Sequence, residues 1–437
     1  MAAHDRPTTD EEVWRYSRVD ELDLERFTPA MPDGTPAIPA GAQAVLDALH
    51  AVAGAVILRN GSVVHQHLDP RWVEAGVTLE SGGGTAGAPN GTSVEQALQA
   101  SGDGVDWFAD LNAAWAPDPV VLSIPRGVDV DEPIVVIDWI DAADVAVFPH
   151  LVVHVGEQAG VQVLDWHGSD DVVALACPVV ELVADAGARV RYLNVQDRGP
   201  GVWQITSQVS RAERDATVTA TQAALGGDYA RTRADCRLVG RGASGELSAL
   251  YFGEREQMLD FRTFQDHAAP DTTSNLLFKG AVGDHSKSVY TGLIKVRKDA
   301  RGTNAFQTNR NVKLSDHAWA ESVPNLEIEN NDVRCSHAST VGPVDEEQRF
   351  YLESRGVPTA VAERLIVGGF FAEVLERLPV LAAIPLIVSR INDRLDRRLA
   401  IEFGSDAARA AIATAERAAH VAEAQAAAAA IERAAAN

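Results

Sequence analysis

Residues 157–163 read Glu-Gln-Ala-Gly-Val-Gln-Val. Three later segments follow a similar pattern: 186–192 (Ala-Gly-Ala-Arg-Val-Arg-Tyr), 214–220 (Arg-Asp-Ala-Thr-Val-Thr-Ala) and 241–247 (Arg-Gly-Ala-Ser-Gly-Glu-Leu). In each segment a turn leads to an alanine and then to a short strand. The aligned alanines, at positions 159, 188, 216 and 243, are separated by 29, 28 and 27 residues. A period of this size indicates stacked supersecondary units, none of which can bury its apolar face alone.

The repeat lies within a longer strand-rich region. From about residue 120 to residue 342, short β-branched strands alternate with Gly, Asp and Ala turns, and helical periodicity is almost absent. Stacked strand-and-turn coils make a β-helix or solenoid, so we expect a mainly β fold whose core spans residues 126–343. A β-sandwich with evenly spaced strands is the alternative that the pattern leaves open.

Residues 1–125 predict a mixed α/β domain. Asn60-Gly61 separates two apolar runs and favours a type I′ hairpin, because both residues accept positive φ. The glycine run at residues 81–87 predicts a flexible loop. It is not followed by the Lys-Ser/Thr pair of a phosphate-binding loop, so we do not expect it to cradle a phosphate.

Residues 344–437 predict a helical C-terminal domain. Acidic residues at 345–347 suit the first turn of a helix, Gly356 can end that helix, and Pro358 can open the next. Isoleucines and leucines spaced by four residues predict a third helix from about Pro385. The alanine-rich tail, 405–437, favours a helix by propensity but has few large apolar residues to attach it to a core.

Composition limits the classes of function. The 437-residue chain has a formal net charge of −24, which argues against nucleic-acid and anionic-membrane partners. The sequence has no signal-peptide pattern, and no apolar stretch approaches the roughly 20 residues of a membrane-spanning helix. Its three cysteines, Cys177, Cys236 and Cys335, are far apart and predict neither a disulfide framework nor a Cys-x-x-Cys metal site. We therefore expect a soluble, cytoplasmic protein.

Cys335 and His337 form the main candidate site. They are two residues apart in an expected strand, so the thiol and the imidazole can face the same side and bind one iron or sulfide. The structural alternative is a buried cysteine next to a turn histidine. Two ligands cannot complete a metal site, so a cluster here would need further ligands from elsewhere or from a partner chain.

Other candidate motifs are weaker. His65 and His67 share a strand face, but only Asp69 lies near them in the sequence. The Asp-His pairs that end at residues 267, 285 and 317 cannot act as dyads on a strand, where adjacent side chains point to opposite faces; we attribute their aspartates to turns. Residues 280–288 end in Lys-Ser but lack the second glycine of a P-loop. We therefore do not expect this chain to be an enzyme.

A long ordered series of segments resembles the SufB/SufD family of iron–sulfur cluster assembly scaffold proteins, mainly between residues 278 and 378. The segments are Trp14-Arg15-Tyr16, Val289-Tyr290-Thr291-Gly292, Ala305-Phe306-Gln307-Thr308-Asn309-Arg310-Asn311, Pro324-Asn325-Leu326-Glu327-Ile328, Asp332-Val333-Arg334-Cys335-Ser336-His337-Ala338-Ser339-Thr340-Val341-Gly342 and Phe350-Tyr351-Leu352. Residues 307–311 contain no cysteine, where the SufB branch carries a scaffold cysteine, so the chain is similar to the SufD branch.

This resemblance implies a right-handed parallel β-helix between an N-terminal domain and C-terminal helices. It implies a SufB-type partner that pairs through the β-helix and a SufC-type ATPase that docks on the C-terminal helices. His337 matches the histidine thought to complete a transient iron–sulfur cluster shared with SufB, and Cys335 matches a cysteine of less certain role. A homodimer of the isolated chain and a flavin in the assembled complex remain open.

Two other functions also remain open at this point. One is a SufB-like scaffold that accepts sulfur itself, for which Cys335 would be the acceptor. The other is a β-helix enzyme such as a polysaccharide lyase or an acyltransferase. Lyases of that kind are usually secreted and bind calcium, and the missing signal-peptide pattern counts against them.

Overall fold

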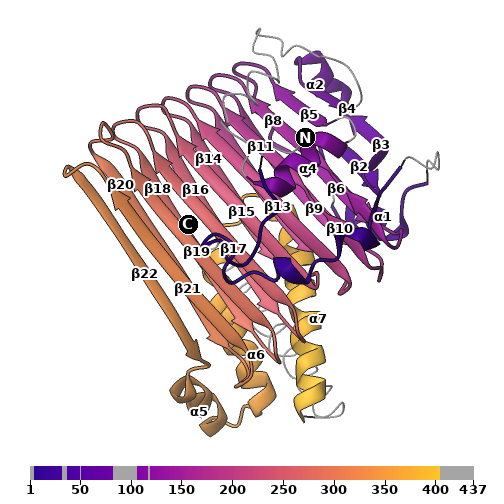
Figure 1. The fold of residues 1–437 in the computed structure, drawn as a ribbon, viewed down its shortest axis with the longest axis vertical. Coiled ribbons are helices and arrows are strands. Elements are labelled where there is room, and N and C mark those ends of the chain that lie inside the picture. The colour runs from indigo at the N-terminus through magenta and orange to yellow at the C-terminus, as the bar shows by residue number, and fades with distance from the viewer. Residues whose placement is uncertain (1–3, 32–36, 50, 82–105, 117–118, 404–437) are drawn as a thin grey trace, which may run out of the picture.

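Two long β-sheets, stacked face to face, form the body of the molecule (Figure 1). The computed structural model describes residues 4–31, 37–49, 51–81, 106–116 and 119–403. Within these residues, sheet A contains twelve strands: β1 (Thr28–Pro29), β4 (Thr78–Ser81), β5 (Val120–Ile124), β7 (Val145–Val147), β8 (His150–Val155), β10 (Ala174–Ala176), β11 (Val179–Ala184), β13 (Val202–Ala212), β15 (Tyr229–Leu238), β17 (Met258–His267), β19 (Lys287–Val296) and β21 (Trp319–Ile328).

Sheet B contains ten strands in the same part of the chain. They are β2 (Gly54–Arg59), β3 (Ser62–Leu68), β6 (Ile134–Ile140), β9 (Gly160–Ser169), β12 (Arg189–Asp197), β14 (Thr217–Ala224), β16 (Ser244–Gly253), β18 (Thr273–Val282), β20 (Thr303–Lys313) and β22 (Val333–Pro343). From β11 onward the chain alternates between the sheets, and each strand pairs in parallel with the strand after next. This pairing confirms the parallel β-helix and excludes the β-sandwich.

The periodic alanines lie at one position of successive coils. Gly160 pairs with Arg189, Arg189 with Thr217, and Thr217 with Ser244, so the alanines that precede these residues are in register. All four alanines are fully buried. The residue before each alanine turns the chain with a positive φ: 58° at Gln158, 68° at Gly187, 59° at Asp215 and 74° at Gly242. Each coil therefore needs a turn residue followed by a side chain small enough for the corner.

The N-terminal region joins both sheets. β2 and β3 form the expected antiparallel hairpin, with φ of 49° at Asn60 and 80° at Gly61. β2 also pairs in parallel with β6, and β5 with β8, so both sheets continue across residue 125. The division of the chain into domains at residues 125 and 343 therefore stays a prediction. Most of the glycine run, residues 82–87, lies outside the described residues.

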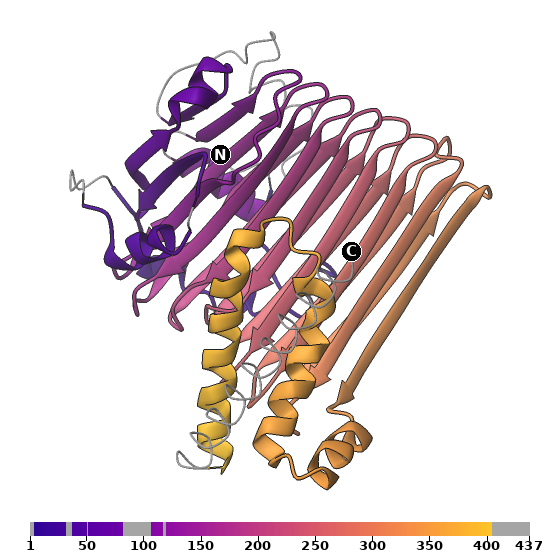
Figure 2. The same ribbon diagram turned by 180° about the vertical axis from the view of Figure 1, so that it is seen from behind.

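Two of the three C-terminal helices lie on the outer face of sheet B, together with α1 (Ala40–Asp47), and the first lies beyond the lower ends of the strands (Figure 2). α5 (Glu346–Ser354) begins at Asp345, whose carboxylate accepts from two backbone N–H groups. α6 (Thr359–Leu375) and α7 (Ile384–Phe403) follow, with a 3₁₀ turn at Leu381–Ala383 between them. Ion pairs attach these helices to the sheet: Lys279 to Glu373 at 2.7 Å and Asp197 to Arg394 at 2.8 Å. The three expected helices are confirmed, and the tail 405–437 lies outside the described residues.

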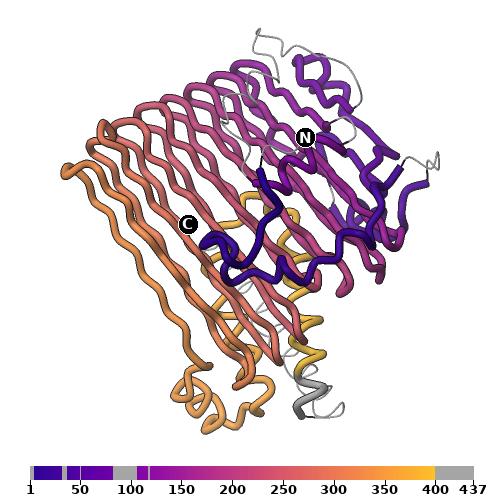
Figure 3. Tube along the Cα trace, viewed as in Figure 1, coloured from indigo at the N-terminus to yellow at the C-terminus, as the bar shows by residue number. Residues whose placement is uncertain are grey.

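The N-terminal segment crosses the outer face of sheet A, as the indigo tube shows (Figure 3). It contains 3₁₀ turns at Val19–Glu21 and Leu24–Arg26, and it lies beside α4 (Trp107–Trp115). The ring of Trp14 lies 5.5 Å from that of Phe108, and Arg18 forms an ion pair with Asp228 at 2.9 Å. A short helix, α2 (Pro70–Glu74), follows β3. Among the described helices, none is both long and apolar enough to span a bilayer.

Candidate functional site

The candidate residues lie on the last strand of the solenoid. β22 ends sheet B and pairs with β20 on one side only, while β21 likewise ends sheet A (Figure 1). Most residues of β22 are exposed, whereas the inward residues of β20 are buried. The β-helix thus presents an open end, with two strand edges that have no neighbour among the described strands.

Cys335 ends a column of inward-facing residues that runs through the whole stack. The column begins with Val161, Val190 and Val218, and Ala305 lies directly beneath Cys335. The cysteine is partly buried and packs in an apolar cluster that includes Ile294. Burial raises the pKa of its thiol, and a backbone hydrogen bond from Ala305 opposes this only in part. A raised pKa makes the thiolate, the form of cysteine that binds metals, less accessible.

His337 continues the next inward-facing column. It pairs in register with Gln307, which is buried and donates from Nε2 to the Tyr290 hydroxyl at 2.6 Å. The other amide atom, Gln307 Oε1, is buried without a hydrogen-bond partner among the described residues. His337 itself is exposed. Its imidazole is therefore open to an external group, directly above a polar interior.

The interior behind the open end contains a connected network of polar side chains. Asn309 donates to the Tyr251 hydroxyl at 3.0 Å, and this hydroxyl donates to Asn311 Oδ1 at 2.7 Å. Asn311 in turn donates to Asn309 Oδ1 at 2.8 Å, so the three side chains close a ring. Reading the sequence alone did not identify this network. Alternate polar residues at 307, 309 and 311 were the available signal, because on a strand they share one face.

The open end does not form a complete metal site. No three His, Cys, Asp or Glu side chains gather closely enough to hold a metal ion in the part of the chain that the structure describes. The structure places Cys335 and His337 two residues apart on one face of β22, as the spacing predicts, and adds no third ligand of these types. A partner chain would have to supply the remaining ligands.

The three Asp-His pairs have different structural roles. Asp266 faces outward and pairs with Arg297 at 2.6 Å, while His267 faces inward and is buried, so these two residues do not act as a dyad. The turn interpretation is therefore wrong for Asp266, which lies within β17. It is right for Asp284, whose φ is 51°. The rings of the other two histidines, at residues 285 and 317, stack across adjacent coils with centroids 4.8 Å apart, a contact that the sequence analysis missed.

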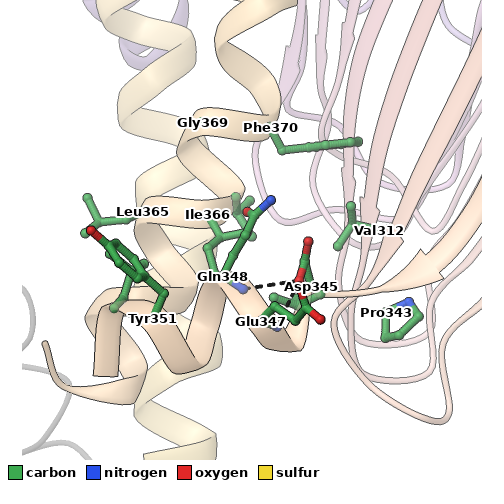
Figure 4. Close-up of a pocket in the computed structure, with 13 residues that line it drawn as sticks. Val312, Pro343, Asp345, Glu347, Gln348, Tyr351, Leu365, Ile366, Gly369 and Phe370 are labelled. Atoms are coloured by element: carbon green, nitrogen blue, oxygen red, sulfur yellow. Dashed lines mark hydrogen bonds between the residues drawn. The ribbon is translucent and has the colours of Figure 1, made fainter. Parts of the chain in front are cut away.

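A groove lies between the C-terminal helices and the lower end of sheet B (Figure 4). Its volume is about 940 Å³, and its lining is mainly apolar, with Val312 and Phe370 on one side and Tyr351 and Leu365 on the other. Tyr351 is 57% exposed and Leu365 47% exposed, so these side chains are accessible from outside. An exposed apolar surface of this kind is typical of a protein–protein contact.

Comparison with known proteins identifies the family. Residues 138–370 match the family described as SUF system FeS cluster assembly, SufBD core domain. The chain belongs to the SufB/SufD family. It is 35% identical over 303 residues to an iron–sulfur cluster assembly SufBD family protein of Mycobacterium tuberculosis, covering 67% of this chain and 73% of the relative. The family predicted from the sequence is thereby confirmed.

Two relatives bear the name of the SufD branch. The iron–sulfur cluster assembly protein SufD of Bacillus subtilis is 28% identical over 316 residues, covering 71% of this chain and 72% of the relative. The SufD of Escherichia coli is 34% identical over 181 residues, covering 41% and 43%. These similarities agree with the SufD-like features of the sequence.

Proposed function

We propose that the chain is a scaffold subunit for iron–sulfur cluster assembly, with the role that the SufD branch implies. In this role it pairs with a SufB-type subunit and docks a SufC-type ATPase, and the iron–sulfur cluster is a transient cargo shared with the SufB-type subunit. The observation that carries the proposal is the open end of the β-helix, which bears His337 and Cys335 on its last strand. The chain contributes ligands and surfaces, and it catalyses no reaction by itself.

The open end suits pairing with another β-helix. Unpaired strand edges expose backbone donors and acceptors that a second chain can satisfy. Apolar side chains around this end are unusually exposed: Leu326 is 37% exposed, Ile328 43% and Val341 41%. A partner that covered them would bury apolar surface and bring its own ligands beside His337. The same end offers a route to a homodimer when the SufB-type subunit is absent.

His337 is the better candidate ligand of the two. Its imidazole is exposed, and a neutral imidazole binds iron and other transition metals well. Cys335 packs against apolar side chains that raise the pKa of its thiol. The same burial counts against the alternative in which this chain accepts sulfur itself, because the nucleophilic form of cysteine is the thiolate. We assign His337 to the shared cluster and give Cys335 a supporting position beside it.

The groove along α5 and α6 is the surface that we propose for the ATPase. It lies on the C-terminal helices, and its exposed Tyr351 and Leu365 can act as apolar anchors. The groove shares only Pro343, at the very end of β22, with the open end, while His337 and Cys335 do not line it, so we propose that two partners can bind at the same time. We place the protein in the cytoplasm. A flavin in the assembled complex stays a prediction to which we assign no residue of this chain.

Co-expression tests the proposal. The tagged chain, produced together with SufB-type and SufC-type subunits, is expected to co-purify with both in defined stoichiometry. Leu365→Glu is expected to lose the SufC-type subunit while the SufB-type subunit is retained. Leu381→Glu is a matched control, because Leu381 is 67% exposed and does not line the groove. Recovery of neither partner by the unaltered chain would refute the proposed function.

A further inference from the structure

Three buried amide side chains lie on the inner face of β20, beneath the last strand of sheet B. They are Gln307, Asn309 and Asn311. Asn309 Oδ1 accepts from Asn311 at 2.8 Å, and Asn311 Oδ1 accepts from the Tyr251 hydroxyl at 2.7 Å. Gln307 Oε1 is buried and accepts no hydrogen bond from any described residue. Of these three amide oxygens, it is the one that is still free to accept.

The nitrogen of the same amide is held by sheet A. Gln307 Nε2 donates to the Tyr290 hydroxyl at 2.6 Å, and this hydroxyl lies 2.9 Å from Thr263 Oγ1. Gly292 makes room for the contact, because a Cβ at this position would overlap both Gln307 Nε2 and the Tyr290 hydroxyl. The hydrogen bond between the sheets therefore fixes the amide with Oε1 facing away from Tyr290. An acceptor that is already fixed loses little further freedom when it binds a donor.

His337 is the next residue along the column that contains Gln307. The two residues pair in register between β20 and β22, which lie side by side at the open end (Figure 1). Side chains in register on neighbouring strands share a face, and the strands are about 4.8 Å apart. His337 is exposed and forms no hydrogen bond with the other described residues, so its ring can turn toward Gln307. A hydrogen bond between them would satisfy an acceptor whose burial without a partner is costly.

A histidine that binds a metal needs an acceptor of this kind. One ring nitrogen binds the metal, and the other carries a proton that is usually donated to a carboxylate, a carbonyl oxygen or water, which selects the tautomer and orients the ring. A second buried atom without a partner lies in the last coil, the hydroxyl of Ser322, which follows Tyr290 in the register of sheet A. A hydroxyl rotates, whereas the Gln307 amide is held by Tyr290. Gln307 is therefore the better-fixed acceptor.

We propose that Gln307 is a positioning residue for His337. Its Oε1 accepts a hydrogen bond from one ring N–H of His337, which leaves the other ring nitrogen unprotonated and free to bind iron at the open end. Gln307 does not touch the cluster and acts only through the imidazole. This inference rests on the proposed function, in which His337 is a ligand of the shared cluster.

The tautomer of His337 in the purified full-length chain tests the hydrogen bond without any cluster. Two-bond proton–nitrogen NMR of the chain labelled with ¹⁵N-histidine, at about pH 8, reports which ring nitrogen carries the proton in a neutral imidazole. The signal of His337 is assigned by its loss in His337→Ala. We expect one predominant tautomer in the unaltered chain and the mixture of a free histidine in Gln307→Met, which keeps the length of the side chain and removes the acceptor. Equal tautomer ratios would overturn the proposal, as would a change in Ser322→Ala and none in Gln307→Met.

Retention of iron by the complex with SufB-type and SufC-type subunits tests the consequence. Gln307→Met is expected to lose iron to a chelator about ten-fold more readily, the usual effect of removing such a partner of a metal-bound histidine. Gln307→Glu keeps an acceptor oxygen and should retain iron as the unaltered chain does.

Gln265→Met is the matched control for lost stability. Gln265 is a buried amide whose Oε1 also lacks a partner, but Ile294 of the next coil follows it in the register. Iron loss by Gln265→Met equal to that of Gln307→Met would refute the positioning role. Iron unchanged even by His337→Ala would instead refute the ligand role in the proposed function, and the tautomer measurement would still decide whether Gln307 bonds to His337.

Discussion

The early coils and the last coil of the β-helix place different residues at the same structural positions. Val163 lies in an early coil with a coil on each side, whereas His337 occupies the last position of the same column. Val163 is fully buried and His337 is exposed. The repeated sequence pattern that forms the successive coils therefore provides no cap for the last one. Where the coils stop, the inward positions change from residues that fill a core to residues that can meet another molecule.

The largest expected effect comes from introducing a charge into an early coil. Val190→Asp would bury an unpaired carboxylate in a fully buried column. We expect a loss of about 5 kcal/mol or more in the free energy of unfolding. Ser339→Asp, at an exposed inward position of the last coil, should change this free energy by less than about 0.5 kcal/mol. Urea denaturation of both variants measures the difference, and equal losses would contradict the distinction between the coils.

A smaller effect is expected from the buried histidine of β17. Burial lowers the pKa of His267 to about 4, and its two ring nitrogens each lie 2.8 Å from a hydroxyl, of Thr272 and of Ser274. Between about pH 6.5 and pH 4 the unfolded chain binds this proton more readily than the folded chain, so stability falls as the pH falls through this window. The contribution is about 3 kcal/mol.

His267→Gln should remove this part of the pH dependence. Urea denaturation at several pH values between 4 and 7 measures it. His67→Gln, an exposed histidine on β3, serves as the control and should keep the full slope. A slope that is the same for His267→Gln and for the unaltered chain would show that His267 does not titrate in this way.

The exposed apolar side chains of the open end, Leu326, Ile328 and Val341, should contribute to the affinity for a partner and little to the stability of the fold. Ile328→Asp places a charge on a side chain that is 43% exposed, so the free energy of unfolding should change by less than about 0.5 kcal/mol. Affinity for the SufB-type subunit should fall about ten-fold or more, because an apolar contact would be replaced by a desolvated charge. Titration of the purified subunits measures the affinity. Unchanged affinity would exclude Ile328 from the interface.

The smallest effect concerns the reactivity of the cysteines. Because burial raises the pKa of the Cys335 thiol, iodoacetamide should alkylate it more slowly at pH 7.5 than it alkylates a cysteine in a peptide. Cys177 and Cys236 are fully buried and should react only after unfolding. Mass spectrometry over time distinguishes the three residues. Rapid alkylation of Cys335 would argue for an activated thiol and would favour the sulfur-accepting alternative.

The sequence predicted the coils because their corners obey local rules. A glycine or aspartate, which accepts positive φ, precedes an alanine at 187–188 and again at 215–216, and the register follows from the spacing. The continuation of the ladder was harder to see. Its next two members are Thr272 and Thr303, buried threonines whose hydroxyls lie 3.4 Å apart. The alanine repeat therefore stops at residue 243, although the coils continue beyond it.

The site was predictable only in part. Strand alternation placed Cys335 and His337 on one face of β22. Only the resemblance to the SufB/SufD family indicated that this pair could bind a shared iron–sulfur cluster. The groove was not predictable, because it depends on how α5 and α6 pack beside sheet B, which no local pattern determines.

In the proposed function, His337 supplies a ligand to a cluster at the open end. The most direct measurement is the iron and acid-labile sulfide content of the complex purified with SufB-type and SufC-type subunits, compared between His337→Ala and the unaltered chain. His67→Ala, an exposed histidine at the far edge of sheet B, is the matched control. We predict that His337→Ala leaves the complex assembled with much less iron and sulfide, while His67→Ala retains both. Unchanged iron and sulfide in the assembled His337→Ala complex would show that His337 is not a ligand of the cluster.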